Sequence, residues 1–234
     1  MKIGILQTGQ APESLRAASG DYPQMFERLL AGHGFIFASW LVEEMAFPAS
    51  IHDADGWLIT GSRHGVYEDH PFIAPLEQFV RDALKATLPV VGICFGHQIM
   101  AQALGGRVEK FSGGWAVGAQ EYDFDGMHLT LNAWHQDQVI TPPEGAQILA
   151  SNASCAYAAL GYGAHGYSVQ AHPEFDDQFI AGLIETRGRG LVPAALLASA
   201  EARQGGPRDQ GELALRIASH FKRHARTAAR TETS

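Results

Sequence analysis

Residues 90 to 98, VVGICFGHQ, combine a cysteine and two glycines in a pattern that favours nucleophilic chemistry. An apolar strand pattern ends in Gly-x-Cys-x-Gly and passes directly into a helix pattern. Such a turn lifts the Cys94 thiol above the end of a sheet, and Gly92 and Gly96 omit the Cβ atoms that would collide there. The start of the helix favours the thiolate, which is the reactive form of cysteine. Cys94 is therefore the candidate nucleophile.

A base and an acid for this nucleophile follow in QAHPEF, residues 170 to 175. His172 and Glu174 come after a strand pattern and are separated by Pro173, which favours an extended backbone. Alternate residues of an extended segment point the same way, so Glu174 can accept the His172 N–H and fix its tautomer. The two motifs together predict a Cys-His-Glu triad. Taken alone, the first motif is also compatible with an inert buried cysteine in a glycine turn. The second motif, taken alone, is more simply an ordinary loop.

The elements that must position these residues follow from alternating strand-like and helix-like patterns in the first half of the chain. Short apolar runs separated by amphipathic stretches predict βαβ units around a parallel sheet. The predicted strands are 2–6, 35–42, 56–60 and 88–93, and the predicted helices are 22–31, 71–86 and 95–104.

From residue 107 the pattern changes to short strand candidates separated by glycine, asparagine or Asp-Gly. Asp125-Gly126 is a typical two-residue hairpin turn, so an antiparallel section is expected after the parallel one. The predicted strands are 107–111, 116–124, 128–131, 146–151, 155–160 and 166–170, followed by helices 176–186, 193–203 and 211–226 and by a tail, RTAARTETS, that is expected to fray.

The whole pattern predicts an α/β fold with a central, mostly parallel sheet flanked by helices and a small antiparallel sheet. We expect a single domain over residues 1–234, with a catalytic core over about 1–190 and C-terminal helices over 191–234. The basic segment from 216 to 230 is most simply the solvated face of an amphipathic helix.

Composition and charge narrow the possible classes of protein. The 234 residues are 46% hydrophobic and 18% charged, which is typical of a globular domain. The net charge of -8 does not indicate the basic surface that binds nucleic acid. Cys94 and Cys155 are too few for a disulfide framework, and Cys155 lies in a strand pattern that predicts a core position. With no signal-peptide pattern and no apolar run near the roughly 20 residues of a membrane span, we expect a cytoplasmic protein without a membrane partner.

In their combination and order, these motifs resemble those of the class I glutamine amidotransferases. The resemblance runs from LITGSRHGVYED through GICFGHQ, KFSGGWAVG and WHQDQV to HPE, and so covers nearly the whole chain. Within that family it is most similar to stand-alone members related to the glutaminase domain of GMP synthetase and to γ-glutamyl peptidases. It implies a flavodoxin-like fold and no cofactor.

The resemblance also implies a reaction. Cys94 attacks the side-chain amide of glutamine, or another γ-glutamyl amide, and ammonia or an amine leaves with a proton from His172. Water then hydrolyses the γ-glutamyl thioester with His172 as base. Glu174 orients the histidine.

Further residue roles are implied around the triad. Oxyanion donors are expected from the backbone of Phe95 and from the Gly61-Ser62 loop, where TGSRHG stands in place of the frequent Gly-Gly-Pro; we favour Ser62. Gln98 is expected to hold the amino-acid end of the substrate. The family pattern also assigns this role to a strand that here corresponds to Ser112, Gly113, Gly114 and Trp115, although a glycine-rich turn is the alternative.

His135 and Asp137 fall where family members carry a His-x-Asp near the mouth of the site, and we expect structural or gating roles for them. The other histidines are expected mainly on the surface or in turns, and no pair has the spacing of a metal site, so no metal is expected. These are His33, His52, His64, His70, His97, His128, His165, His220 and His224.

Three functional hypotheses stay open at this point. The chain is a glutaminase that supplies ammonia to a separate synthetase, a free-standing hydrolase of small γ-glutamyl compounds, or a catalytically silent binding or regulatory homologue. Neither a phosphate-binding GxxxxGK[ST] loop nor a pyrophosphatase-like loop is found in the sequence. Other families with a cysteine elbow place the acid ahead of the histidine or ahead of the elbow, whereas here it follows His172 by two residues.

Overall fold

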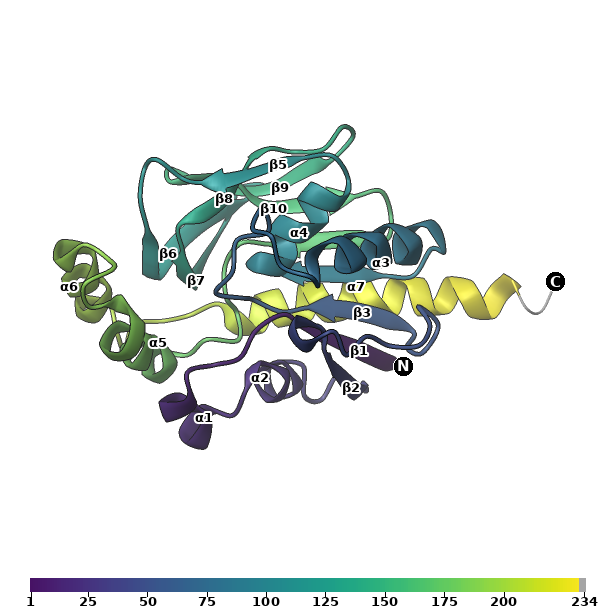
Figure 1. Ribbon diagram of the computed structural model, residues 1–234, viewed down its shortest axis with the longest axis horizontal. Helices are drawn as coiled ribbons and strands as arrows, with labels where there is room; N and C mark the ends of the chain where they lie inside the picture. The colour runs from purple at the N-terminus through teal and green to yellow at the C-terminus, as the bar shows by residue number, and fades with distance from the viewer. Residues whose placement is uncertain (232–234) are drawn as a thin grey trace.

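The computed structural model describes the backbone of residues 1–231 and the side chains of residues 1–223. Over this range the chain forms an α/β fold with a nine-stranded mixed sheet flanked by helices and a separate two-stranded antiparallel sheet (Figure 1). The predicted fold class is confirmed. In chain order the elements are β1 (Lys2–Gln7), α1 (Glu13–Ser19), α2 (Tyr22–Leu29), β2 (Ile36–Leu41), a 3₁₀ turn (Val42–Glu44), β3 (Gly56–Ile59), α3 (Ile73–Lys85), β4 (Val90–Ile93), α4 (Phe95–Ala103), β5 (Arg107–Lys110), β6 (Ala116–Phe124), β7 (Met127–His135), β8 (Asp137–Thr141), β9 (Gln147–Asn152), β10 (Cys155–Tyr162), β11 (Gly166–Val169), α5 (Asp177–Leu183), a π-helical turn (Ile184–Gly188), α6 (Ala194–Ala202) and α7 (Gln210–Thr231).

The large sheet has the strand order β2-β1-β3-β4-β11-β10-β9-β6-β7. Strands β2, β1, β3, β4 and β11 run parallel to their neighbours. From β11 to β7 the pairing is antiparallel. The parallel half has the order of a flavodoxin-like sheet, in which functional sites lie beyond the carboxyl ends of the strands. In this fold those ends belong to β1, β3, β4 and β11.

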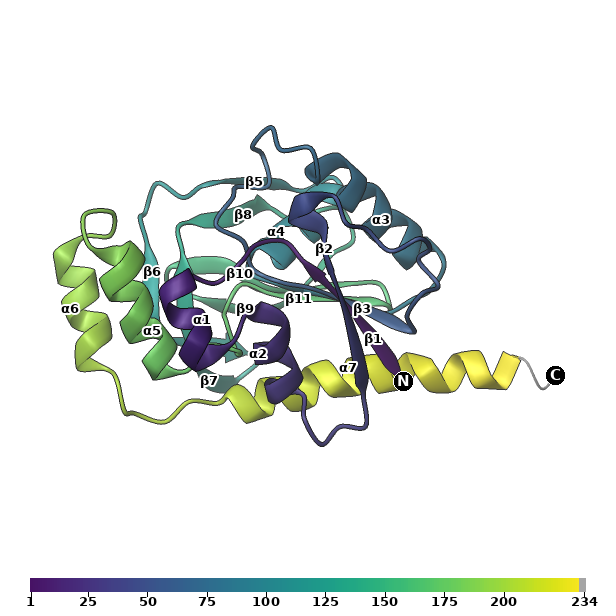
Figure 2. The same ribbon diagram turned by 60° about the horizontal axis from the view of Figure 1, so that its bottom comes forward.

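Helices cover both faces of the parallel half because successive strand residues point to opposite sides. Ile3 and Ile5 of β1 pack into a core with α2 and α7, whereas Leu6 packs into a second core with α3 and α4. Figure 2 shows α2 beside α7, which agrees with their direct contacts. The fully buried Ile217 and Phe221 make α7 part of the first core.

A third cluster lies where α5 and α6 are found, at the end of the molecule away from α3 (Figure 1). Phe179 of α5 and Leu197 of α6 are buried there with Val117 of β6. The π-helical turn between these helices carries Arg187 to the edge of the cavity described below. This end of the fold therefore contributes a wall to the candidate site.

Several local predictions are corrected by the structure. Helix α1 was not predicted because it buries no residue and so lacks an amphipathic pattern. Strand β8 was missed because its partner is the distant β5, and β7 extends well past the predicted strand at 128–131. Helix α7 continues to Thr231, beyond the predicted end at residue 226, and residues 232–234 of the predicted frayed tail lie outside the described residues.

The predicted hairpin between β6 and β7 is confirmed. Asp125 and Gly126 have φ values of 55° and 86°, as a two-residue turn between antiparallel strands requires. Within residues 1–231, none of the helices is both long enough and apolar enough to span a membrane.

Candidate active site

Cys94 lies at the turn from β4 into α4, with φ 52° and ψ -101°. This backbone conformation is strained for a residue with a side chain and is the mark of a sharp strand-to-helix elbow. A Cβ added to Gly92 would lie 2.3 Å from Gly96 O, and one added to Gly96 would lie 2.3 Å from Ile59 O. Real Cβ atoms do not approach backbone so closely, and both positions therefore require glycine.

His172 and Glu174 follow β11, the parallel neighbour of β4. The Cys94 N–H donates to Val169 O at 2.9 Å, which holds the end of β11 against the elbow. His172 Nδ1 lies 2.7 Å from Glu174 Oε1, and the two side chains are 4% and 1% exposed. The His172 ring stacks on Phe175 with 4.0 Å between centroids and a 5° interplanar angle. The imidazole is thus fixed both by a carboxylate and by an aromatic face.

The electrostatic surroundings of His172 combine opposing effects. Burial lowers the pKa of His172, but the neighbouring Cys94 and Glu174 raise it through their charges and hydrogen bonds, and the pKa lies well above the ordinary histidine value. The ring therefore favours the imidazolium form when Cys94 is a thiolate.

A cavity of about 280 Å³ opens over Cys94 and His172. This volume lies near the small end of ligand sites in proteins and suits a ligand of amino-acid size. The wall comes from α2, α4, the loop after β3, the β5–β6 and β7–β8 connections and the π-helical turn. It includes Tyr22, Ser62, Gln98, Trp115, His135, Asp137 and Arg187.

The Gly61-Ser62 loop lies directly against the Cys-His pair. A Cβ added to Gly61 would lie 2.9 Å from His172 Cε1 and 3.9 Å from Cys94 Cβ. The Gly61 carbonyl oxygen lies 3.1 Å from Thr8 Oγ1 and 3.1 Å from Thr60 Oγ1. Because C=O and N–H of a trans peptide point in opposite directions, this arrangement turns the N–H of the next residue away from the two threonines.

Phe95, the other predicted oxyanion donor, is the first residue of α4. The N–H groups of the first helical turn lack acceptors within the helix, so this group is available to a ligand. Gln98, one turn further on, lines the cavity. Its side-chain nitrogen donates to Asp137 O at 2.8 Å and to Gln170 Oε1 at 3.1 Å, which commits both of its donors to the protein.

Of the predicted substrate-binding stretch, only Trp115 belongs to the described cavity wall. Residues 112–115 form the turn between β5 and β6, which is the alternative that the glycine-rich sequence left open, and not the strand that the family pattern implied. Gly114 adopts φ 95° and its N–H donates to Phe111 O at 3.1 Å. Gly113 packs against the Phe111 ring. These contacts stabilise the turn.

Two histidines near the site are deeply buried. His135 lines the cavity with its Nδ1 3.2 Å from Asp137 O, and burial together with the charge of His172 lowers its pKa to about 3. The prediction that placed His97 among surface and turn histidines is wrong, since His97 is fully buried with its Nδ1 2.8 Å from Ser168 Oγ. Burial lowers the pKa of His97 to about 3 as well.

Some residues of the cavity wall were not anticipated from the sequence. Tyr22, Trp134 and Arg187 come from three elements far apart in the chain, and only Trp134 lies in a motif named above, WHQDQV. Arg187 donates from its Nη2 to Gln10 O at 3.3 Å, which fixes its side chain at the cavity wall. Only the tertiary arrangement brings these groups together.

One group of described side chains has the composition and spacing to hold a metal ion. One ligand atom each from His64, Glu68 and His70 lies within 4.8 Å of the other two. His64 and Glu68 also line the cavity, so the group is adjacent to the triad without being part of it.

Several known proteins with similar sequences have names that refer to the chemistry of glutamine or γ-glutamyl compounds. A glutamine amidotransferase-like protein of Schizosaccharomyces pombe is 27% identical, over 92% of this chain and 96% of that protein. Gamma-glutamyl peptidase 3 of Arabidopsis thaliana is 25% identical, over 74% of this chain and 76% of that protein. A glutamine-hydrolyzing GMP synthase of Macrococcus caseolyticus is 31% identical over 57% of this chain, which corresponds to 29% of the longer relative.

A solved structure shows the same fold, and a family model shows the family. The crystal structure of a glutamine amidotransferase from Methylobacillus flagellatus has a similar fold, with a TM-score of 0.71 and 20% identity over 95% of this chain and 93% of that one. The model of the family "Glutamine amidotransferase class-I" matches residues 40–178, a range that includes Ser62, Cys94, His172 and Glu174. This chain therefore belongs to the class I glutamine amidotransferase family.

Proposed function

We propose that this protein hydrolyses the side-chain amide of glutamine, or of a related γ-glutamyl compound, with Cys94 as nucleophile, His172 as acid and base, and Glu174 as the residue that orients His172. The observation that carries the proposal is the 2.7 Å contact of His172 Nδ1 with Glu174 Oε1, together with a strained cysteine elbow that opens into the same cavity. Orientation of the base through one nitrogen leaves the other nitrogen for Cys94.

In the first half of the reaction, the Cys94 thiolate attacks the amide carbon and forms a tetrahedral intermediate. His172 donates its proton to the leaving nitrogen, the C–N bond breaks, and ammonia or an amine departs. A γ-glutamyl thioester remains on Cys94. In the second half, His172 takes a proton from water as the water attacks the thioester. The C–S bond then breaks, which releases the γ-carboxyl product and restores the Cys94 thiolate beside the protonated His172.

Both intermediates carry a negative oxygen that needs hydrogen-bond donors. We assign the backbone N–H groups of Phe95 and Ser62 to this role. The position of Phe95 at the start of α4 and the two threonine hydroxyls around Gly61 O support this choice over the N–H of Gly61.

The proposed binding of the amino-acid end of the substrate is modified by the contacts around the cavity. Gln98 Nε2 is committed to Asp137 O and Gln170 Oε1, so we assign substrate contact to its oxygen and to the Trp115 side. Gly113 and Gly114 then act indirectly, by shaping the turn that carries Trp115.

A second candidate function is that of a free-standing γ-glutamyl peptidase. It is favoured by the match to gamma-glutamyl peptidase 3, which covers 76% of that relative, whereas the matched GMP synthase is covered over 29% of its length. In the first function a separate synthetase receives the ammonia; in the second no acceptor is needed. Because the reaction requires a reduced thiol, we also propose a cytoplasmic location.

The test is a screen of the purified chain, without any partner, against glutamine and a panel of γ-glutamyl amides and dipeptides with product identification. We expect hydrolysis that is abolished in Cys94→Ala. Hydrolysis restricted to γ-glutamyl peptides would select the peptidase function, and glutamine hydrolysis stimulated by an acceptor synthetase would select the amidotransferase function. Equal activity in the wild type and Cys94→Ala would refute the mechanism, and inactivity toward the whole panel with and without acceptors would favour a silent binding homologue.

A further inference from the structure

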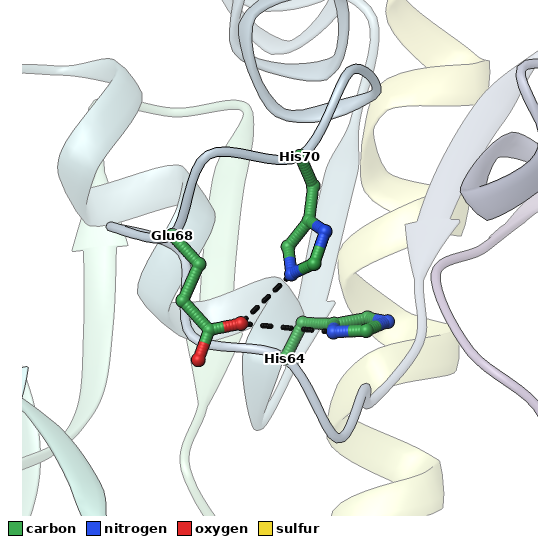
Figure 3. A group of neighbouring side chains, drawn as sticks. All are labelled: His64, Glu68 and His70. Carbon is green, nitrogen blue, oxygen red and sulfur yellow. Dashed lines mark hydrogen bonds and ion pairs between the residues drawn. The ribbon is translucent and has the colours of Figure 1, made fainter.

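A cluster of three side chains that commonly bind metals lies on the loop between β3 and α3, next to the catalytic cavity. Figure 3 shows His64, Glu68 and His70 directed toward one another from this loop. One ligand atom from each lies within 4.8 Å of the other two. The catalytic proposal uses none of the three, although His64 and Glu68 lie within the LITGSRHGVYED segment named above.

The two histidines direct a ring nitrogen at the same carboxylate oxygen. His70 Nε2 lies 2.8 Å and His64 Nδ1 lies 3.6 Å from Glu68 Oε2. Zinc binds imidazole nitrogen and carboxylate oxygen at about 2.0–2.2 Å, so ligand atoms of a tetrahedral site lie about 3.4 Å apart. The Glu68 side chain is 46% exposed and so has the freedom to adjust its carboxylate toward that spacing, and the two ring nitrogens lie within 4.8 Å of each other.

His64 is oriented by a second carboxylate on its far side. Its Nε2 lies 3.0 Å from Glu43 Oε1. A neutral imidazole has a single N–H, and with that group donated to Glu43 the lone pair of Nδ1 points toward Glu68 Oε2. Two electron-rich atoms that face each other in this way are stabilised by a cation between them. A ligating histidine whose other nitrogen donates to a carboxylate is the usual arrangement at metal sites.

The loop holds the cluster in place through its own backbone and through packing. The N–H groups of Glu68 and His70 donate to Gly65 O and Glu68 O at 3.1 and 3.0 Å. The rings of His64 and His70 lie 4.0 Å apart, and their centroids are 6.1 and 5.9 Å from that of the buried Phe72. Because the ligands are close in sequence, little chain entropy is lost when an ion draws them together.

We propose that His64, Glu68 and His70 bind one divalent cation, with Zn²⁺ as the best match, and that water completes its coordination. Two imidazoles and one carboxylate suit Zn²⁺ better than Mg²⁺ or Ca²⁺, which prefer oxygen ligands. Side-chain exposures of 17% for His64 and 31% for His70 leave a face open to solvent. The ion cross-links the loop that also carries Ser62, whose hydroxyl accepts the His64 N–H at 3.2 Å.

Zn²⁺ binding to the purified full chain tests this proposal, with stoichiometry measured by equilibrium dialysis and affinity by calorimetry. We expect one Zn²⁺ per chain that a large excess of Mg²⁺ does not displace. His64→Gln and His70→Gln should lose this ion, whereas His52→Gln, at an exposed position outside the cluster, should keep it. Glu43→Gln should keep the ion but bind it about 10- to 100-fold more weakly.

Cys94 and His172 also carry a thiol and an imidazole that can bind Zn²⁺. The Cys94→Ala variant removes that thiol and so distinguishes zinc bound at the triad from zinc bound by His64, Glu68 and His70. The proposal predicts wild-type stoichiometry in Cys94→Ala and, with Co²⁺ in place of Zn²⁺, no thiolate-to-metal charge-transfer band. Circular dichroism would establish that each variant is folded. Loss of the ion in Cys94→Ala but not in His70→Gln would overturn the proposal. Absence of Zn²⁺ binding by the wild type would also overturn it, since the cluster would then be a network of hydrogen bonds and ion pairs only.

Discussion

The charge state of His172 is governed by neighbours on opposite sides of its ring. Glu174 Oε1 accepts from Nδ1 at 2.7 Å, and Cys94 interacts with the ring from the cavity side. The charges of both neighbours raise the pKa of His172 against the effect of burial. When the thiolate is converted to a thioester, one of these charges disappears and the pKa of the ring falls. The same residue can therefore give a proton in the first half of the reaction and take one in the second.

The pH profile of Glu174→Gln tests this electrostatic arrangement. Loss of the carboxylate removes a charge that raises the pKa of His172, so the imidazolium should deprotonate at lower pH. We expect the alkaline limb of kcat/KM to move to lower pH and the maximal rate to fall by roughly 10²–10⁴, as for neutral replacements of an orienting acid. An alkaline limb that stays in place would contradict a coupling between Glu174 and the catalytic histidine.

The orientation of the Gly61-Ser62 peptide gives a second prediction at this scale. Thr8→Val removes a hydroxyl that lies 3.1 Å from Gly61 O, and so frees the peptide to rotate its N–H away from the oxyanion. We expect kcat to fall by up to roughly 10²-fold, the lower end for loss of one donor, with little change in KM. Thr8→Ser retains the hydroxyl and should retain the rate. A Thr8→Val enzyme that loses only substrate affinity would argue against Ser62 as the donor.

At the scale of elements, the site depends on three strand ends that meet at one edge of the sheet. Strand β4 supplies Cys94, β3 leads into Ser62, and β11 leads into His172 and Glu174. The register of β4 with β11 pairs Ile93 with Val169, so the elbow and the histidine segment leave the sheet side by side. The parallel pairing, rather than any local sequence preference, sets the distance between nucleophile and base.

The close approach of the elbow to β3 predicts the effect of Gly96→Ala. The new Cβ would lie 2.3 Å from Ile59 O, so strand and helix must separate. We expect a loss of about 1–3 kcal/mol in the free energy of unfolding, measured by urea denaturation, with a large loss of activity. Gly211→Ala, where no atom lies within 4 Å of the new Cβ, should leave both unchanged or raise stability slightly. Equal stability of the two variants would contradict the tight elbow.

At the scale of the whole molecule, the C-terminal helix belongs to the same folded unit as the strands. Phe221 of α7 is fully buried and packs edge-on against Phe35 at 5.8 Å between centroids. This packing supports our proposal that residues 1–234 form one domain with the catalytic core over about 1–190 and C-terminal helices over 191–234. Helix α7 covers the face of the sheet that also packs against α2.

Truncation of a single side chain measures this contribution. Phe221→Ala should lower the free energy of unfolding by about 3–5 kcal/mol in one cooperative transition. Leu215→Ala lies on the same helix with its residue 53% exposed and should cost less than about 0.5 kcal/mol. A separate transition for α7, or no loss of stability in Phe221→Ala, would show that the helix is not part of the domain.

The sequence predicts the parallel half of the fold well because strands β1, β3, β4 and β11 are buried on both faces and helices α2 and α3 are amphipathic. Local sequence patterns do not predict α1, which has no such pattern, or β8, whose partner strand is distant in the chain. The elbow glycines were predictable from the steric needs of one turn. Arg187 and the His64 cluster were not, because the first is positioned by a π-helical turn and the second by backbone turns that leave no periodic signal.

The proposed mechanism depends on Cys94 as the nucleophile, and the second cysteine, Cys155, serves as an internal control for this assignment. Both cysteines are free and buried, but burial raises the pKa of Cys155 to about 12, which keeps that thiol unreactive. A glutamine analogue that carries a diazo-ketone, followed by peptide mass mapping, distinguishes the two directly. We predict stoichiometric modification of Cys94, protection by glutamine or a γ-glutamyl substrate, and an unmodified Cys155. Modification of Cys155 in place of Cys94 would contradict the assignment.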